Sequence, residues 1–166
     1  MKYILIIFFL FNAFHSFSQS ITINELVKLY RMDSTKIRKY CVKNNIPIRT
    51  TYESKYNMVV INCDVTKDTI LNNKKFDKGI RFFNRYFPID KTQAPYYDGL
   101  TYVMHSKTEF QTLFAQLDKN GFVEKSFKYQ VKGKGNDYLF ENDDISIQIV
   151  ELYDLHIYNF TFYPKE

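Results

Sequence analysis

Ser106-Lys-Thr-Glu-Phe-Gln-Thr-Leu-Phe-Ala-Gln-Leu-Asp-Lys-Asn-Gly121 is the stretch that decides the fold. Ser106 and Glu109 form a capping box, in which the hydroxyl accepts a hydrogen bond from a first-turn amide and the carboxylate reaches back to the cap residue. Asn120-Gly121 provides the left-handed stop that is common at helix ends. We therefore expect an amphipathic helix, and a sheet or a second helix must cover its apolar stripe of Phe110, Leu113, Phe114 and Leu117.

Strand patterns occur on both sides of this helix. The chain has 14 Tyr and 16 Phe, and aromatic side chains favour half-buried pleated surfaces. The short spacings between the strand patterns favour an antiparallel meander. The sequence thus predicts an α+β fold, with a mostly antiparallel sheet covered by two or three helices. We expect strands at 58–65, 80–87, 100–105, 126–131, 138–141, 145–149 and 155–163, and a weaker one at 69–76.

A pair of short helices is expected near the beginning of the chain. Thr22 and Glu25 repeat the capping-box pattern, and a second helix is expected to begin at Asp33 or Ser34 and to end before Pro47. Residues 22–45 then form a helix–turn–helix pair followed by strands. In each half of the chain a capped helix precedes a set of strands. One interpretation is therefore a tandem repeat of a helix–meander unit, with halves at 19–105 and 106–166.

The first residues have the pattern of a signal peptide. A positive start at Lys2 precedes an apolar run, and Ser16-Phe17-Ser18 places small residues where a signal peptidase cleaves. The apolar run is shorter than the roughly 20 residues of a membrane span. We expect a signal peptide at 1–18, cleavage between Ser18 and Gln19, and a single exported α+β domain at 19–166, periplasmic or extracellular, without a stable membrane anchor. The alternative is an uncleaved N-terminal anchor.

The charge of the chain is modestly basic. The formal net charge is +5, and the positive residues are scattered rather than gathered in blocks, which is typical of solvated faces. A basic net charge can favour binding to nucleic acid, but an exported protein is rarely in the same compartment as nucleic acid. We therefore expect no nucleic-acid partner and consider another envelope protein as the partner.

Cys41 and Cys63 are expected to face the same interior. Cys41 lies on the apolar face of the second helix, and Cys63 lies on the apolar face of the first expected strand. Export permits oxidation, so the sequence leaves open a structural disulfide or two buried free thiols. A nucleophilic cysteine is disfavoured because neither residue has a neighbouring sequence that would lower its pKa.

The remaining polar groups give no catalytic, cofactor or metal signature. His105 precedes a helix cap, His156 is expected in a strand, and neither has a second ligand at metal spacing. Residues 141–144 are acidic but lack the spacing of a calcium loop, and a polar turn explains them. Residues 132–135 are expected to form a basic turn rather than a phosphate loop.

The order of these features resembles that of small exported proteins of Bacteroidota. The resemblance rests on the Ser-Phe-Ser-Gln junction, on the helix of Asn24 to Leu29, on the helix end at Asn120 to Phe122 and on the closing meander. It covers most of the mature chain and implies a fold but no activity.

Three functions are compatible with these observations. The preferred hypothesis is a non-catalytic binding or interaction protein of the envelope, because tyrosines suit contact surfaces and no catalytic set is present. An inhibitor or immunity-type protein is a narrower alternative, by analogy of fold only. The other alternative is a small secreted hydrolase that uses Cys41 or Cys63 with His105 or His156.

Overall fold

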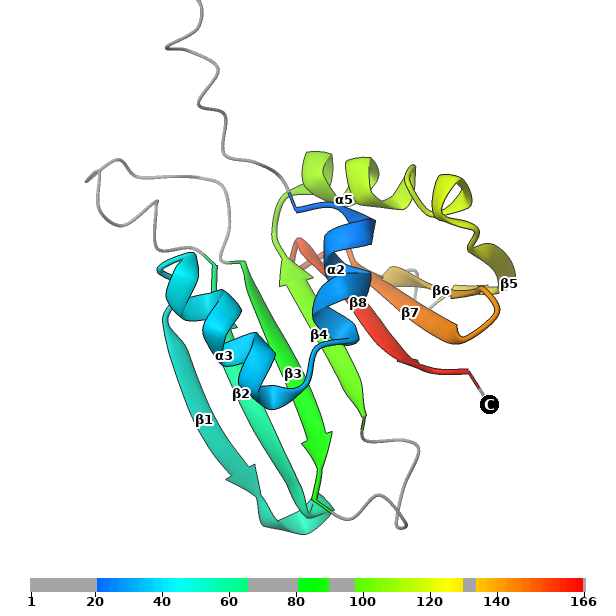
Figure 1. The fold of residues 1–166 in the computed structure, drawn as a ribbon. Helices are drawn as coiled ribbons and strands as arrows, with labels where there is room; N and C mark the ends of the chain where they lie inside the picture. Colours follow the sequence, from blue (N-terminus) through cyan, green and yellow to red (C-terminus); the bar gives the residue numbers. More distant parts are fainter. Residues whose placement is uncertain (1–20, 66–80, 90–97, 130–133, 166) are drawn as a thin grey trace, which may run out of the picture.

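The computed structural model describes residues 21–65, 81–89, 98–129 and 134–165. This part of the chain forms three α-helices, two 3-10 turns (Ser54–Tyr56 and Asp118–Asn120) and eight strands (Figure 1). The helices are α2 (Ile23–Tyr30), α3 (Ser34–Lys43) and α5 (Lys107–Phe114). The strands are β1 (Ile48–Glu53), β2 (Met58–Asp64), β3 (Phe82–Pro88), β4 (Gly99–Met104), β5 (Val123–Tyr129), β6 (Gly135–Glu141), β7 (Ile145–Leu152) and β8 (Ile157–Pro164).

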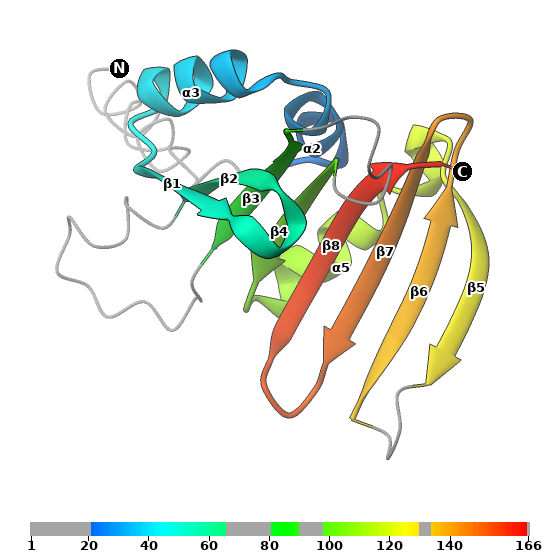
Figure 2. The same cartoon turned by 90° about the horizontal axis from the view of Figure 1, so that it is seen from below.

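All eight strands form one sheet in the order β1-β2-β3-β4-β8-β7-β6-β5, and every neighbouring pair is antiparallel. Strands β1 to β4 form one meander and β5 to β8 form another (Figure 2). The two meanders meet where β4 pairs with β8, with Thr101 opposite Thr161. The expected α+β fold with a mostly antiparallel sheet is therefore confirmed.

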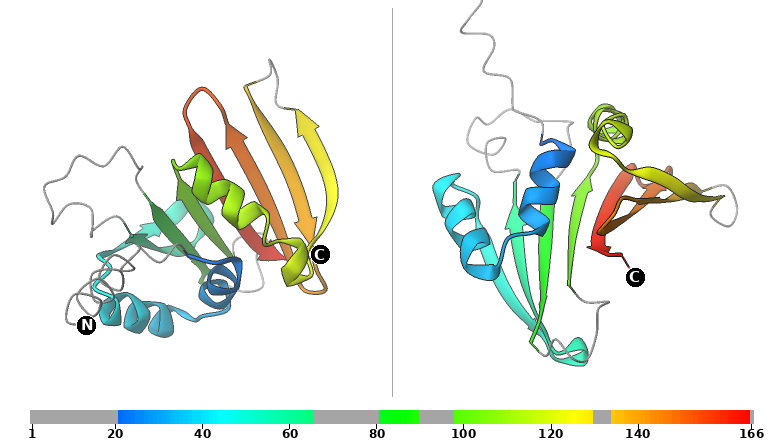
Figure 3. Two further views of the ribbon diagram at one scale, coloured as in Figure 1. Left: turned by 90° about the horizontal axis from the view of Figure 1, so that it is seen from above. Right: turned by 45° about the vertical axis from the view of Figure 1, so that its right-hand side comes forward.

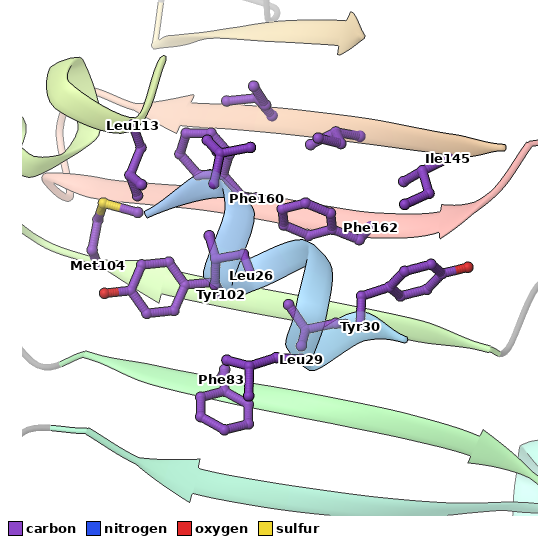
Figure 4. Packing of buried hydrophobic residues seen from close by; sticks show 14 of the residues in the cluster. Leu26, Leu29, Tyr30, Phe83, Tyr102, Met104, Leu113, Ile145, Phe160 and Phe162 are labelled. Atoms are coloured by element: carbon purple, nitrogen blue, oxygen red, sulfur yellow. The ribbon is translucent and has the colours of Figure 1, made fainter. Parts of the chain in front are cut away.

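The three helices pack on one face of the sheet (Figure 3). Leu26 and Leu29 of α2 are fully buried above the central strands, and Leu113 of α5 is buried over the second meander (Figure 4). Burial of each such side chain contributes about 2 kcal/mol. The sheet side of this core consists mainly of aromatic and aliphatic residues, among them Phe83, Leu100, Tyr102, Met104, Ile147, Ile149, Phe160 and Phe162.

The helices begin where their capping residues predicted. Thr22 and Glu25 form the full capping box of α2, since each side chain bonds to the backbone of the other residue. Asp33 caps α3 by accepting from the amide of Lys36 at 2.8 Å. Ser106 accepts from the amide of Glu109 at 3.3 Å and caps α5. These local bonds orient the helices at the points where the chain enters them.

The prediction of a full capping box at α5 is wrong in its second half, the return bond from Glu109. Glu109 does not reach back to Ser106; its carboxylate accepts a hydrogen bond from the Tyr102 hydroxyl at 2.8 Å and pairs with Arg81 at 2.7 Å. Only 5% of Glu109 is exposed. A buried charge requires an opposite charge and hydrogen bonds, and Arg81 and Tyr102 satisfy both needs better than a single backbone amide.

Arg85 forms a second buried polar anchor, beneath the end of α2. Its Nη1 donates to Asp98 at 2.5 Å and to the Gly99 carbonyl at 3.0 Å. The guanidinium also lies over two rings, 5.1 Å from the centroid of Tyr30 and 4.6 Å from that of Phe87. Planar, weakly hydrated Arg suits such a site between aromatic faces, so Arg85 connects α2 to β3 and to the start of β4.

Several boundaries differ from expectation. Helix α5 ends at Phe114 and continues as turns up to Gly121, whose φ of 78° is the predicted left-handed stop. The strand expected at 126 begins at Val123, with a register shift between Glu124 and Ser126. Strand β1 was not expected at all. It lies at the edge of the sheet, and most of its residues are exposed, so it lacks the apolar alternation of a half-buried strand.

Some expectations fall on residues outside the described ranges. They are the signal segment 1–18 with the Ser18–Gln19 junction, the weak strand at 69–76 and most of the basic turn at 132–135. Gly135, which was placed in that turn, is instead the first residue of β6. Within the described ranges, no helix combines the length and the apolarity needed to cross a membrane.

Candidate functional site

The face of the sheet turned away from the helices, here called the open face, is the candidate binding site. Side chains alternate between the two faces of a strand, so the residues between core positions point to this face. One residue from each strand lies at the same level, and together they form a transverse row. In sheet order the row consists of Arg49, Asn62, Asn84, Thr101, Thr161, Gln148, Leu139 and Ser126.

The transverse row is unusual for the middle of a wide sheet because seven of its eight side chains are polar. Its two central hydroxyls, Thr101 Oγ1 and Thr161 Oγ1, lie 3.4 Å apart, a weak hydrogen-bond distance. Gln148 donates to both carboxylate oxygens of Asp137, at 3.1 and 3.0 Å. The centre of the open face therefore presents amides and hydroxyls that can still exchange partners with a bound surface.

Apolar and aromatic side chains flank this row on the same face. Phe82 and Val103 lie at one neighbouring level, and Tyr86 and Tyr163 lie at the other. Phe82, Tyr86 and Tyr163 are partly exposed. The open face thus combines aromatic rings with hydrogen-bonding groups and is neither a broad aromatic patch nor a face of Lys, Ser and Gln alone.

An open hollow of about 430 Å³ lies at the β1–β3 end of the transverse row. The side chains that line it include a guanidinium, a carboxylate, two carboxamides and a phenyl ring, from Arg49, Asp64, Asn62, Asn84 and Phe82. Within the described ranges, the carboxamide of Asn62 donates over long distances, 3.3 Å to the Thr51 hydroxyl and 3.4 Å to the Arg49 carbonyl. The hollow can therefore donate to and accept from a polar group inserted into it.

Cys41 and Cys63 come together as predicted from their faces. Their sulfur atoms lie 3.2 Å apart, and both residues are buried in the core. This distance is longer than the roughly 2.05 Å of a disulfide, and both cysteines are free in this structure. The hydrogen bond between the thiols and their burial raise the pKa of the Cys63 thiol, whereas the same hydrogen bond lowers the pKa of Cys41.

The histidines do not join the cysteines. Within the described ranges no hydrogen bond links either histidine to Cys41 or Cys63. His105 lies between β4 and α5, and the expectation of a strand at His156 is wrong. His156 occupies the exposed β7–β8 turn with a φ of 49°, because the chain reverses there between Leu152 and Ile157. The geometry gives no support to a Cys–His nucleophile.

The acidic residues at 141–144 form a turn. The side chain of Asn142 accepts from the backbone amides of Asp144 and Ile145, and Asp144 pairs at 2.7 Å with Arg31, the residue that follows α2. Among the described residues no group of three or more His, Cys, Asp and Glu side chains is arranged to hold a metal ion. These contacts connect the β6–β7 turn to α2.

The open face could not be found from sequence alone, because its row depends on strand order and register. The alternating polar positions, such as Thr161 between Phe160 and Phe162, were the only local signal. Comparisons with protein-family models, with curated proteins and with solved structures found no match to this chain.

Proposed function

We propose that this protein is an exported, non-catalytic binding protein of the cell envelope, and that the open face of its sheet receives a protein partner. The observation that carries the proposal is the transverse row. A polar line with flanking aromatics, on the sheet face opposite the described helices, has the mixed composition of a protein interface. A standard interface covers about 800 Å² on each partner, which a face of eight strands can supply.

Export is part of this proposal. A signal peptide at 1–18, with cleavage between Ser18 and Gln19, would deliver the chain to the periplasm or beyond. In that oxidising setting we propose that Cys41 and Cys63 form a disulfide, because their sulfur atoms already lie 3.2 Å apart. The intact mass of the protein recovered from its cells measures both features. An uncleaved chain would contradict the export proposal, and a first residue other than Gln19 would contradict the cleavage site.

Recovery of a partner with matched variants tests the binding proposal. Wild type, Thr161→Arg and Thr112→Arg are used as baits in envelope extracts. Thr161 lies in the centre of the open face, whereas Thr112 lies on the exposed surface of α5. We expect wild type and Thr112→Arg to retain a common protein that Thr161→Arg loses, with all three baits folded. Retention of the same protein by Thr161→Arg would overturn the assignment of the site.

The identity of that partner separates the two forms of the proposal. An inhibitor or immunity-type protein would lower the activity of the enzyme or toxin that it binds. A structural or transport partner would show no such loss. Either result is compatible with the open face as the site, so the activity measurement decides only the type of binding protein.

A further inference from the structure

A cluster of aromatic rings around a buried carboxylate lies on the helix-side face, at the β5–β6–β7 end of the sheet. Helix α5 crosses the second meander obliquely, and the C-terminal end of β5 and the N-terminal end of β6 extend beyond it (Figure 3). In register, Tyr129 lies opposite Asn136, and Asn136 lies opposite Glu151. We call the group the aromatic–carboxylate cluster; it consists of Phe127, Tyr129, Asn136, Tyr138, Glu151 and Tyr153.

The centre of the cluster is rich in oxygen, and its hydrogen-bond donors are neutral. Asn136 and Glu151 are only 8% and 7% exposed. The amide nitrogen of Asn136 lies close to three oxygens. The Tyr153 hydroxyl is 2.5 Å away, the Tyr138 hydroxyl 2.8 Å and the Glu151 carboxylate 3.2 Å. The amide nitrogen carries two hydrogens and each tyrosine hydroxyl carries one, so the donors at the centre of the cluster are all neutral groups. The carbonyl oxygen of Asn136 is also buried and has no hydrogen-bond partner.

Glu151 has no cationic partner within the described part of the chain. The nearby Lys134 pairs instead with Asp154, at 3.3 Å, where both side chains are largely exposed. Burial, followed by the charge of Glu151, raises the pKa values of Tyr153 and Tyr158. A buried carboxylate is costly unless an opposite charge compensates it. No cation of the described ranges does so here, so a bound cation would stabilise Glu151.

Aromatic rings form an open rim beside this charge. Tyr129 is 77% exposed, Tyr153 41% and Phe127 38%. The ring centroid of Phe127 lies 4.7 Å from that of Tyr129 and 5.0 Å from that of Tyr138. The faces of such rings carry partial negative charge and attract ammonium and guanidinium groups. Packing alone does not explain Tyr129, because most of its ring remains in solvent.

We infer that the aromatic–carboxylate cluster binds the cationic side chain of a lysine or arginine presented by a protein partner. The exposed rings receive the alkyl part and the face of the cation, and Glu151 supplies the opposite charge beneath them. The inference does not depend on the open face, because the cluster lies on the other side of the sheet. The ligand also differs: the cluster binds a positively charged group, whereas the open face presents amides, hydroxyls and aromatic rings.

Titration with blocked amino acids tests the inference. The probes are N-acetyl-arginine and N-acetyl-lysine methylamides, and their neutral counterparts are the citrulline and norleucine derivatives. We expect the cationic probes to produce saturable NMR shifts at Tyr129, Glu151 and Tyr153, and the neutral probes to produce none. Equal shifts from charged and neutral probes, or no saturable shifts, would overturn the inference.

Variants locate the binding. Glu151→Gln should weaken the cationic probes about tenfold, and Tyr129→Ala several-fold, within the range of cation–π and charge contributions. Tyr52→Ala is the matched control, because Tyr52 is an exposed tyrosine on the opposite edge strand, β1. The high exposure of Tyr129 means that Tyr129→Ala remains informative even if Glu151→Gln fails to fold. Unchanged affinity in Tyr129→Ala would contradict the inference.

Discussion

The sulfur atoms of Cys41 and Cys63 lie 3.2 Å apart in the core and connect helix α3 to strand β2. The first prediction concerns this pair. Oxidised glutathione should exchange its disulfide with the two thiols: the Cys41–Cys63 S–S bond forms, the S–S bond of glutathione breaks, and the two glutathione thiolates released take up the two protons. Because the bond closes a loop of about 20 residues, it should raise the free energy of unfolding by about 3 kcal/mol.

Mass and alkylation measure this change. The oxidised protein should lose the mass of two hydrogen atoms and should resist alkylation after denaturation until it is reduced. Cys41→Ala with Cys63→Ala is the control and should show no difference in stability between oxidised and reduced samples. Two thiols that alkylate upon denaturation without reductant, after exposure to the oxidant, would contradict the prediction.

The buried carboxylate of Glu109 should be essential to stability. Glu109→Ala leaves Arg81 without this ion pair and Tyr102 without its acceptor, and such losses cost roughly 3–5 kcal/mol. Tyr102→Phe removes only the hydroxyl bond and should cost about 1 kcal/mol. Urea denaturation of both variants measures the difference. A similar loss in the two would show that the ion pair with Arg81 contributes little.

Stability should fall at high pH, partly because of Tyr30. Burial, and then the charge of Asp98, raises the pKa of Tyr30 from 10.0 to about 12. Since the folded pKa lies above the unfolded one, this contribution is complete below pH 10 and is lost as the pH rises from 10 to 12. It amounts to about 2–3 kcal/mol. Tyr30→Phe should reduce the slope of unfolding free energy against pH in that window, and a slope equal to that of wild type would contradict the prediction.

Gly135 should not tolerate a side chain. A Cβ there would lie 1.9 Å from the backbone oxygen of Glu151 on the neighbouring strand, so β6 and β7 would have to separate locally. Gly135→Ala should cost about 3 kcal/mol, as overpacking does. Gly121→Ala is the comparison, because its Cβ meets nothing within 4 Å and only its φ of 78° is unfavourable, at about 1 kcal/mol. Thermal unfolding that ranks them in reverse would contradict this account.

The predictable parts of the fold were those specified locally. Thr22, Asp33 and Ser106 marked the helix starts because a capping side chain bonds to backbone only a few residues away. The alternation in β7 and β8 predicted strands because one side of each is buried. The proximity of Cys41 and Cys63 also followed, since each was placed on the apolar face of its own element.

The parts that sequence could not predict depend on distant partners. Glu109 turns toward Arg81, 28 positions away, and no local pattern distinguishes this from a capping box. Strand β1 is recognisable only through its pairing with β2, since its exposed polar side chains do not alternate with apolar ones. The open face arises because β4 pairs with β8, which places Thr101 beside Thr161 across 60 positions.

The affinity of Thr161→Arg for the purified partner tests the central claim most directly. An arginine at the centre of the open face should obstruct any surface that lies across β4 and β8. We expect the dissociation constant to rise by a factor of about 100, the effect of losing a few kcal/mol at the centre of an interface, while Thr112→Arg binds as wild type. Equal affinities for Thr161→Arg and wild type, with both proteins folded, would contradict the assignment of the open face as the binding site.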